Sequence, residues 1–212
     1  MNRTGLFITF EGPEGAGKSS QIALLADVFR QRGRAVLTTR EPGGTPLGEE
    51  LRRLVKHFGG PGSVAPEAEL LMFGASRAQL VRHVIRPHLE QGGVVLCDRF
   101  ADSTTVYQGL ARGLDPAFIE RLHDFTLGDC WPDLTFVLDV SVETGFTRAR
   151  ARSQGGPVDR IEAEARPFHE AVRQGFLALA ERHPERFRVL DGEAPPAAVH
   201  RQVLECLDHA LG

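Results

Sequence analysis

The stretch 10–20, Phe-Glu-Gly-Pro-Glu-Gly-Ala-Gly-Lys-Ser-Ser, constrains the fold more than any other part of this chain. It matches the pattern G-x-x-x-x-G-K-[ST] at Gly12, Gly17, Lys18 and Ser19. The apolar run Leu6–Phe10 precedes it, and apolar residues at helical spacing follow it over 22–29. A bare match is expected by chance in roughly one chain in a hundred of this length. A strand before the loop and a helix after it favour a phosphate-binding loop over a helix start that merely tolerates glycines.

A loop of this kind binds phosphate with its backbone. Glycines let the chain bend until several N–H groups converge on one anion, and the following helix adds its N-terminal donors and its dipole. Lys18 would place a positive charge on the β- and γ-phosphates, and the Ser19 hydroxyl would ligate Mg²⁺. We therefore expect a nucleoside triphosphate to be bound by Gly12, Pro13, Glu14, Gly15, Ala16, Gly17, Lys18, Ser19 and Ser20.

The rest of the chain alternates strand patterns with helical ones. Strands are predicted at Leu6–Phe10, Ala35–Thr39, Val94–Asp98, Leu134–Val140 and Phe187–Leu190. Helices are predicted between them, including a long one over Pro66–Gln91. This alternation predicts an α/β fold with five parallel strands and helices on both faces of the sheet. The order of the strands cannot be read from the pattern.

Charged residues directly follow two of the predicted strands. Val94–Asp98 is a buried strand pattern ending in an acid, which suits a carboxylate that faces the metal of the phosphate loop. A helix N-cap is the alternative role for Asp98. Arg40 and Arg99 come immediately after strand patterns. Because ligands bind at the carboxyl ends of parallel strands, we expect both arginines to share a crevice with the phosphate loop.

A basic segment late in the chain is predicted to form a flap. The helix expected over Ser141–Arg152 ends with Arg148, Arg150 and Arg152, and a segment containing Gly-Gly-Pro follows. Arginines near a helix C-terminus are often only solvated. In a protein with a phosphate loop we favour a mobile flap, at about 148–162, that closes over the ligand and excludes water.

Composition limits the class of protein. The chain has 212 residues, 42% of them hydrophobic and 25% charged, so we expect a single domain over 1–212. A formal net charge of −3 and a pI of about 6.2 give no overall positive field for a nucleic acid or an anionic membrane. Three cysteines without metal-ligand spacing, and the lack of a signal-peptide pattern or long apolar run, favour a cytoplasmic protein.

The absence of several motifs excludes other classes of phosphate-loop protein. A GTPase reads guanine with an Asn-Lys-x-Asp segment, and the only asparagine of this chain is Asn2. Asp98 does not begin an Asp-x-x-Gly switch because Ala101 stands where the glycine would be. Arginine, not a second acid, follows Asp98, unlike the pattern of hexameric ATPases. The reaction that remains for a phosphate-loop protein of this kind is phosphoryl transfer to a small acceptor. A phosphate monoester acceptor would need no general base, because its second pKa is about 6.

Together these motifs resemble those of bacterial thymidylate kinases. They occur in the family's order and span nearly the whole chain: the phosphate loop, Thr39–Gly44, Leu71–Phe73 with Arg77, Asp98–Phe100, Tyr107–Gly109 and 148–162. The resemblance implies the P-loop kinase sheet with strand order 2-3-1-4-5. It also implies transfer of the ATP γ-phosphoryl group to dTMP, giving dTDP for dTTP biosynthesis, with Mg²⁺ and in a homodimer.

The resemblance implies roles for residues near the acceptor phosphate and the sugar. Arg40 and Arg99 would bind the phosphate of dTMP, and Glu14 would bind the 3′-hydroxyl. Asp98 would organise Mg²⁺ through water. Tyr107 would crowd the ribose 2′ position and so favour deoxyribose.

Further roles concern the base and the flap. Phe73 would stack on thymine while Arg77 bonds a base carbonyl, with Thr104 and Gln108 nearby. In the bacterial subtype resembled here, Gly15 replaces a loop arginine and the flap supplies the catalytic one. The catalytic residues expected on this basis are Lys18, Arg99, Arg150 and Arg152, with Arg152 the first choice, and Arg148 is expected near the nucleotide donor.

Two other interpretations remain open. One is a kinase for another nucleoside monophosphate, such as dUMP or UMP. The other is a nucleotide-binding regulatory protein that works without an acceptor. Independently of these, we expect a cis peptide bond at Glu41-Pro42, because a rigid turn there would aim Arg40.

Overall fold

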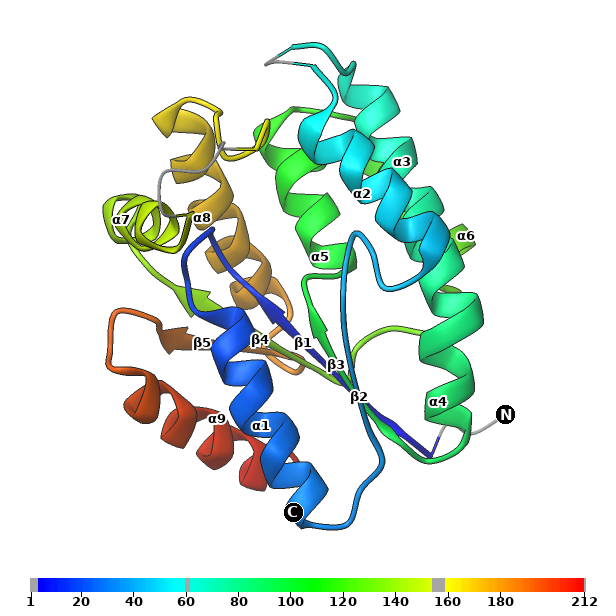
Figure 1. Ribbon diagram of the computed structural model, residues 1–212, viewed down its shortest axis with the longest axis vertical. Coiled ribbons are helices and arrows are strands. Elements are labelled where there is room, and N and C mark those ends of the chain that lie inside the picture. Colours follow the sequence, from blue (N-terminus) through cyan, green and yellow to red (C-terminus); the bar gives the residue numbers. More distant parts are fainter. Residues whose placement is uncertain (1–3, 60–61, 154–158, 212) are drawn as a thin grey trace.

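A parallel sheet lies at the centre of the computed structural model, which describes residues 4–59, 62–153 and 159–211 (Figure 1). Over these residues the sheet has five strands in the order β2-β3-β1-β4-β5. They are β1 (Leu6–Glu11), β2 (Val36–Arg40), β3 (Val94–Asp98), β4 (Leu134–Asp139) and β5 (Phe187–Asp191). All four neighbouring pairs are parallel. The predicted α/β class and the strand order 2-3-1-4-5 are both confirmed.

Helical segments connect the strands. They are α1 (Lys18–Gln31), α2 (Pro46–His57), α3 (Pro66–Leu80), η1 (Val81–Ile85), α4 (Arg86–Glu90), α5 (Ala101–Thr104), η2 (Thr105–Ala111), α6 (Pro116–Leu127), α7 (Val142–Ser153), α8 (Arg166–Arg182) and α9 (Pro196–Leu211). Helices α2 and α6 begin alike: a side-chain oxygen of Thr45 or Asp115 accepts a backbone N–H, and proline follows at the first helical position. Among the described residues, no helix is long and apolar enough to cross a membrane.

Alternate strand residues build a core on each face of the sheet. Ile8 and its same-face neighbours pack against α1 and α9, which lie side by side in Figure 1. Phe7 and Val95 face the other way and pack against α3, η1 and α4. Val137 of β4 packs with α8 and η2. Because successive strand residues point to opposite faces, continuous apolar runs suit strands covered on both sides.

The helix predicted over Pro66–Gln91 is not one regular helix. A π-helical turn, η1, separates α3 from α4, and the N–H of Arg86 bonds the carbonyl of Val81, five residues back. Pro87 comes next. Proline has no N–H to donate and its ring crowds the carbonyl four residues earlier, so a locally wider turn accommodates it. The expected Glu41-Pro42 cis peptide bond is present.

The strand ends set the position of the site. In the sheet register Arg40 at the end of β2 pairs with Asp98 at the end of β3, and Asp98 pairs in turn with Phe10 of β1. The phosphate loop leaves β1 directly after Glu11. The chain therefore places the loop, Arg40 and Asp98 at one edge of the sheet.

Candidate active site

A cavity of about 460 Å³ opens at this edge of the sheet. Its walls come from the phosphate loop, from the ends of β2 and β3, and from α2, α3, α5, η2 and α8. The predicted site residues that line it are Glu14, Gly15, Ala16, Gly17, Lys18, Ser19, Ser20, Arg40, Phe73, Asp98, Arg99, Tyr107 and Gln108. The structure thus brings into one cavity most of the residues predicted for the donor and the acceptor.

Lys18 lies at the start of α1, directly after Gly17, whose left-handed conformation (φ 93°) opens the helix. Its side chain folds back over the loop, and Nζ donates to the carbonyls of Gly12 (3.3 Å) and Pro13 (3.0 Å). Burial lowers the pKa of the Lys18 ammonium, and the positive charge of Arg99 adds to this effect. A buried ammonium at the phosphate loop is a ready site for an anion.

Gly15 fills a position with no room for a side chain. Its φ is 74°, and a Cβ atom there would collide with the carbonyl oxygen of Gly145 in α7. A Cβ at Gly145 would in turn collide with the Glu14 carbonyl oxygen. The phosphate loop and the helix that carries the predicted flap arginines are therefore in direct backbone contact, which excludes a catalytic arginine at position 15.

Ser19 and Asp98, the two residues predicted to serve a metal, are in contact. The Ser19 hydroxyl donates to Asp98 Oδ2 over 2.7 Å. The alternative role of Asp98 as a helix cap is not seen, because α5 begins at Ala101 with Phe100 at its N-cap. Oxygen ligands of this kind are those that Mg²⁺ prefers, and Mg²⁺ commonly uses only one or two protein groups beside phosphate and water.

Arg99 adopts an unusual backbone conformation that sequence reasoning did not predict. Its φ of 65° makes it the one non-glycine residue with positive φ among those described. Its guanidinium donates to Glu14 Oε2 (3.3 Å) and Ser103 Oγ (3.3 Å) and lies 5.1 Å from the ring centre of Tyr107. Burial alone would lower the pKa of Arg99, but Tyr107 and the surrounding carboxylates outweigh it and raise the pKa. The guanidinium is thus a permanent positive charge facing the phosphate loop.

Glu11, which sequence reasoning missed, supports the turn at Arg99. The last residue of β1, it is fully buried, and its carboxylate accepts the N–H of Phe100 (2.7 Å) and the hydroxyl of Ser103 (2.6 Å). Burial raises the pKa of Glu11 to about 8, and the nearby Asp102 also raises it. The sequence feature that could have identified Glu11 is an acid at the end of an apolar strand, just before the phosphate loop.

Arg40 and the cis-proline loop form the wall next to α2. Arg40 Nη2 donates to Glu49 Oε2 over 2.9 Å, and the other oxygen of Glu49 accepts the N–H of Gly44 over 2.9 Å. More than half of the Arg40 side chain is exposed, so it lines the open part of the cavity. The next residue, Glu41, turns the opposite way and is buried.

The predicted base ligands Arg77 and Thr104 lie beneath the cavity and are not among the described residues that line it. Arg77 has no exposed surface, and its guanidinium bonds Glu41, Thr104 and Nδ1 of His123. Burial, with the positive charge of Arg77, lowers the pKa of His123 to about 3, so this imidazole stays neutral. This arrangement shows no direct access of Arg77 to a base, and its role as a base ligand stays a prediction.

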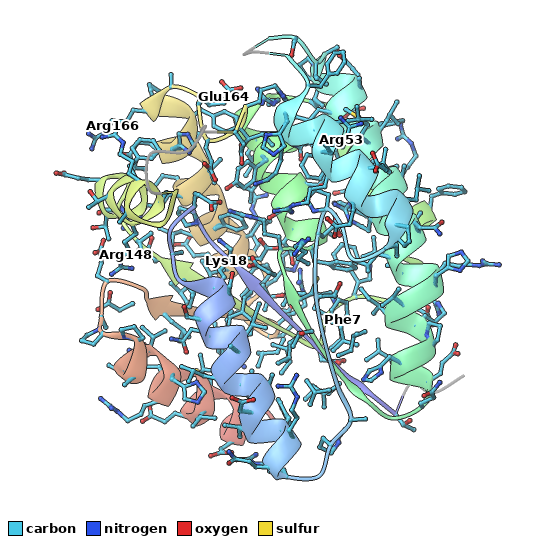
Figure 2. All side chains as sticks on the ribbon, in the orientation of Figure 1. Phe7, Lys18, Arg53, Arg148, Glu164 and Arg166 are labelled. Atoms are coloured by element: carbon cyan, nitrogen blue, oxygen red, sulfur yellow. The ribbon has the colours of Figure 1, made fainter. Side chains whose placement is uncertain are left out.

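Two of the predicted flap arginines, Arg148 and Arg150, are not brought to the cavity. Arg148 donates to the carbonyls of Gly192 (2.7 Å) and Glu193 (3.4 Å) after β5, and Figure 2 shows it well apart from Lys18. Arg150 is exposed on α7. Neither is among the described residues that line the cavity. The Arg152 side chain and residues 154–158 of the expected flap lie outside the described part of the chain. The segment after them reaches the cavity, where Asp159 pairs with Lys56 over 2.6 Å.

Two anion sites therefore share one cavity: backbone amides beside Lys18, and the guanidinium of Arg99, which Glu14 links directly to the phosphate loop. On a parallel sheet with this strand order, such a pair defines a P-loop kinase that phosphorylates a small acceptor. The chain belongs to the thymidylate kinase family, whose model matches residues 10–203.

Individual relatives agree with this assignment. The chain is 51% identical over 193 residues to a thymidylate kinase of Thermomicrobium roseum, covering 91% of this chain and 90% of the relative. It is 50% identical over 200 residues to one of Pseudomonas fluorescens, covering 94% and 93%. The crystal structure of thymidylate kinase from Ehrlichia chaffeensis has a TM-score of 0.77 and 33% identity, covering 96% of this chain and 98% of that one.

Proposed function

We propose that this protein transfers the γ-phosphoryl group of ATP to the phosphate of dTMP, forming dTDP for dTTP synthesis. The observation that carries the proposal is that Lys18 on the phosphate loop and Arg99 at the end of β3 line the same cavity, where Arg99 also bonds Glu14 of the loop. Phosphoryl transfer requires two anions in line with their charge neutralised, and this pair provides one cationic site for each.

On the donor side, the backbone N–H groups of Gly12 and of residues 14–20 would bind the β- and γ-phosphates of ATP, with Lys18 as the positive charge. Ser19 and Asp98 fit Mg²⁺, which when bound would neutralise charge on the phosphates of ATP. Arg150 and Arg152 are proposed to approach the transferred phosphoryl group from the flap, at 148–162 of a single domain over 1–212. Arg148 would serve the donor nucleotide.

On the acceptor side, Arg99 and Arg40 would bind the dTMP phosphate, whose oxygen is the nucleophile. Glu14 would bind the 3′-hydroxyl. Phe73 and Tyr107 line the cavity where the base and the ribose would lie, with Gln108 beside them. Burial raises the pKa of the Tyr107 hydroxyl to about 12, so this group stays neutral and can donate a hydrogen bond. Arg77 would bond a carbonyl of the base, with Thr104 nearby.

A coupled assay that follows ADP tests the activity. The purified chain with ATP and Mg²⁺ is expected to turn over dTMP faster than dUMP, UMP or dCMP, and to hydrolyse ATP only slowly without an acceptor. Equal or faster turnover of dUMP or UMP would favour a different monophosphate kinase. Hydrolysis that does not depend on any acceptor would favour the regulatory alternative.

We further propose a cytoplasmic homodimer. Cys97, Cys130 and Cys206 are free thiols, which suits a reducing compartment. An apolar surface on α3 and α6 suits self-association: Phe125 is 86% exposed, Leu71 53% and Phe118 41%. The two helices pack against each other with Leu122 beside Gly74. Leu71 is one turn from Gly74, and Phe118 and Phe125 are each one turn from Leu122, so all three lie on the sides of α3 and α6 that are near this contact.

Replacing Phe125 by aspartate is expected to convert a dimer into a monomer, because it would place a charge in the apolar contact. Light scattering coupled to gel filtration measures the change. Leu24→Asp, on the exposed side of α1, is the matched control and should leave the dimer intact. A parent chain that is monomeric at micromolar concentration, or a Phe125→Asp variant that stays dimeric, would contradict the proposed surface.

A further inference from the structure

A buried carboxylate on the acceptor side of the cavity has no role in the reaction described so far. Glu69 lies on α3, one turn before Phe73, and is 1% exposed. Its Oε1 accepts from Gln108 Nε2 (2.8 Å) and Arg112 Nε (2.7 Å), and its Oε2 accepts from Arg112 Nη2 (3.2 Å) and from Arg160. Three side chains from two separate parts of the chain therefore meet at this carboxylate.

The carboxylate is ionised. Burial alone would raise the pKa of Glu69, but the hydrogen bonds from Arg112, Gln108 and Arg160 outweigh burial and lower it. An ionised carboxylate can only accept hydrogen bonds. The side-chain amide of Gln108 must therefore turn its nitrogen toward Glu69, because its oxygen would find no hydrogen-bond donor there.

This orientation decides what Gln108 offers to a ligand. The nitrogen and the oxygen of an amide point away from each other, so the nitrogen bonded to Glu69 leaves the oxygen turned away from it. Gln108 is buried but lines the cavity with Phe73 and Tyr107, where the proposed function places the base. The group available to a base from this side chain is a hydrogen-bond acceptor.

We propose that Glu69 is a positioning residue for base selection: it holds Gln108 with its carbonyl oxygen toward the cavity, so that the acceptor base must present an N–H there. The inference rests on the proposed function. Thymine and uracil carry a donor at N3, whereas cytosine carries an acceptor at N3. A cytosine at this place would set two acceptors against each other, and buried unpaired polar groups of this kind discriminate strongly.

The variant Glu69→Gln tests the idea because the local geometry dictates how the new amide would lie. Its single oxygen is best placed at the position of Oε2, where two charged donors, from Arg112 and Arg160, meet. Its NH₂ group would then take the position of Oε1 and face both Gln108 and Arg112 Nε. A guanidinium cannot accept a hydrogen bond, so only Gln108 can pair with the new NH₂ group, by turning its amide over. Gln108 would present a donor to the cavity, and the preference for an N3 donor would be lost.

The measured quantity is the ratio of kcat/KM for dTMP to kcat/KM for dCMP. We expect this ratio to fall by about tenfold or more in Glu69→Gln, since one mispaired buried hydrogen bond has about this effect. Glu164→Gln is the matched control: Glu164 accepts from the same Arg112 over 2.9 Å, but no hydrogen bond joins it to Gln108. The control should keep the parent ratio within about twofold. A merely structural role of Glu69 would lower both rates together and leave the ratio unchanged, and this result would overturn the proposal.

Two further variants keep the test decisive. If Glu69→Gln does not fold, Glu69→Asp replaces it. The shorter carboxylate keeps its charge against the arginines but withdraws from Gln108, so the ratio of kcat/KM for dTMP to kcat/KM for dCMP should fall. An unchanged ratio would overturn the proposal. Gln108→Met removes the amide and should also lower the ratio; an unchanged ratio there would equally overturn it. A parent chain that phosphorylates no pyrimidine monophosphate would refute the proposed function itself, which is a separate outcome.

Discussion

Replacing Lys18 by alanine is expected to lower kcat/KM for ATP by about 10³-fold, since removal of one preorganised charge from a phosphoryl-transfer site has effects of this order. Lys18 Nζ already lies against the carbonyls of Gly12 and Pro13, so little reorganisation is needed when phosphate enters the loop. Steady-state kinetics at saturating dTMP measures the loss. A kcat/KM within about tenfold of the parent would contradict the role of Lys18.

Lys18→Met separates this loss from unfolding. The pKa of the Lys18 ammonium is lowered, first by burial and then by Arg99, so the folded chain binds that proton less tightly than the unfolded chain does. At pH values below the pKa of the unfolded chain, burial of this group therefore costs stability, and the cost disappears as pH rises past that pKa. Methionine fills the same space without the charge. We expect its Tm to equal or exceed that of the parent while its activity falls as in Lys18→Ala.

Features carried by local sequence were predictable. The phosphate loop follows from glycines, Lys18 and Ser19 at fixed spacing between a strand and a helix. Asp98 follows from an acid at the end of a buried run, because parallel strands bring their carboxyl ends to one edge. The resemblance to a family supplied the strand order, which alternation alone leaves open.

Features that depend on distant partners were not predictable. Arg77 shares a helix with Phe73, and that spacing suggested a common ligand, yet Glu41, 36 residues earlier, holds its guanidinium beneath the cavity. The left-handed conformation of Arg99 depends on the hydrogen bonds that Glu11 makes to Phe100 and Ser103. No pattern near Arg99 encodes these contacts. The contact of Arg148 with the Gly192 carbonyl, in the turn after β5, also has no local signal, and the role of Arg148 at the donor stays a prediction.

Arg99→Ala is expected to lower kcat/KM for dTMP by about 10² to 10³-fold, because it removes the partly buried cation proposed to bind the acceptor phosphate. The dissociation constant for ATP, measured without acceptor, should change little, since Lys18 and the loop amides remain. A loss of kcat/KM for dTMP with an unchanged dissociation constant for ATP is the result expected of a residue that binds only the acceptor. Unchanged turnover of dTMP would instead support the regulatory alternative, in which no acceptor takes part.

Loss of stability is the competing explanation for Arg99→Ala. The left-handed backbone at φ 65° is equally costly for arginine and alanine, so the change in stability comes from the lost hydrogen bonds to Glu14 and Ser103. Their loss is expected to cost about 1 kcal/mol, which for a chain of this size corresponds to a Tm lower by about 2–4 °C. Arg99→Lys keeps a positive charge in the same conformation but loses the planar fork that binds phosphate through two N–H groups. We expect it to recover part of the dTMP activity, with a Tm close to that of Arg99→Ala. Arg53→Ala, on the outer side of α2 and away from Lys18 in Figure 2, should match the parent in both measurements. Since Arg53→Ala also removes an arginine, a dTMP-specific loss confined to position 99 must come from the site of that charge rather than from the net charge of the protein.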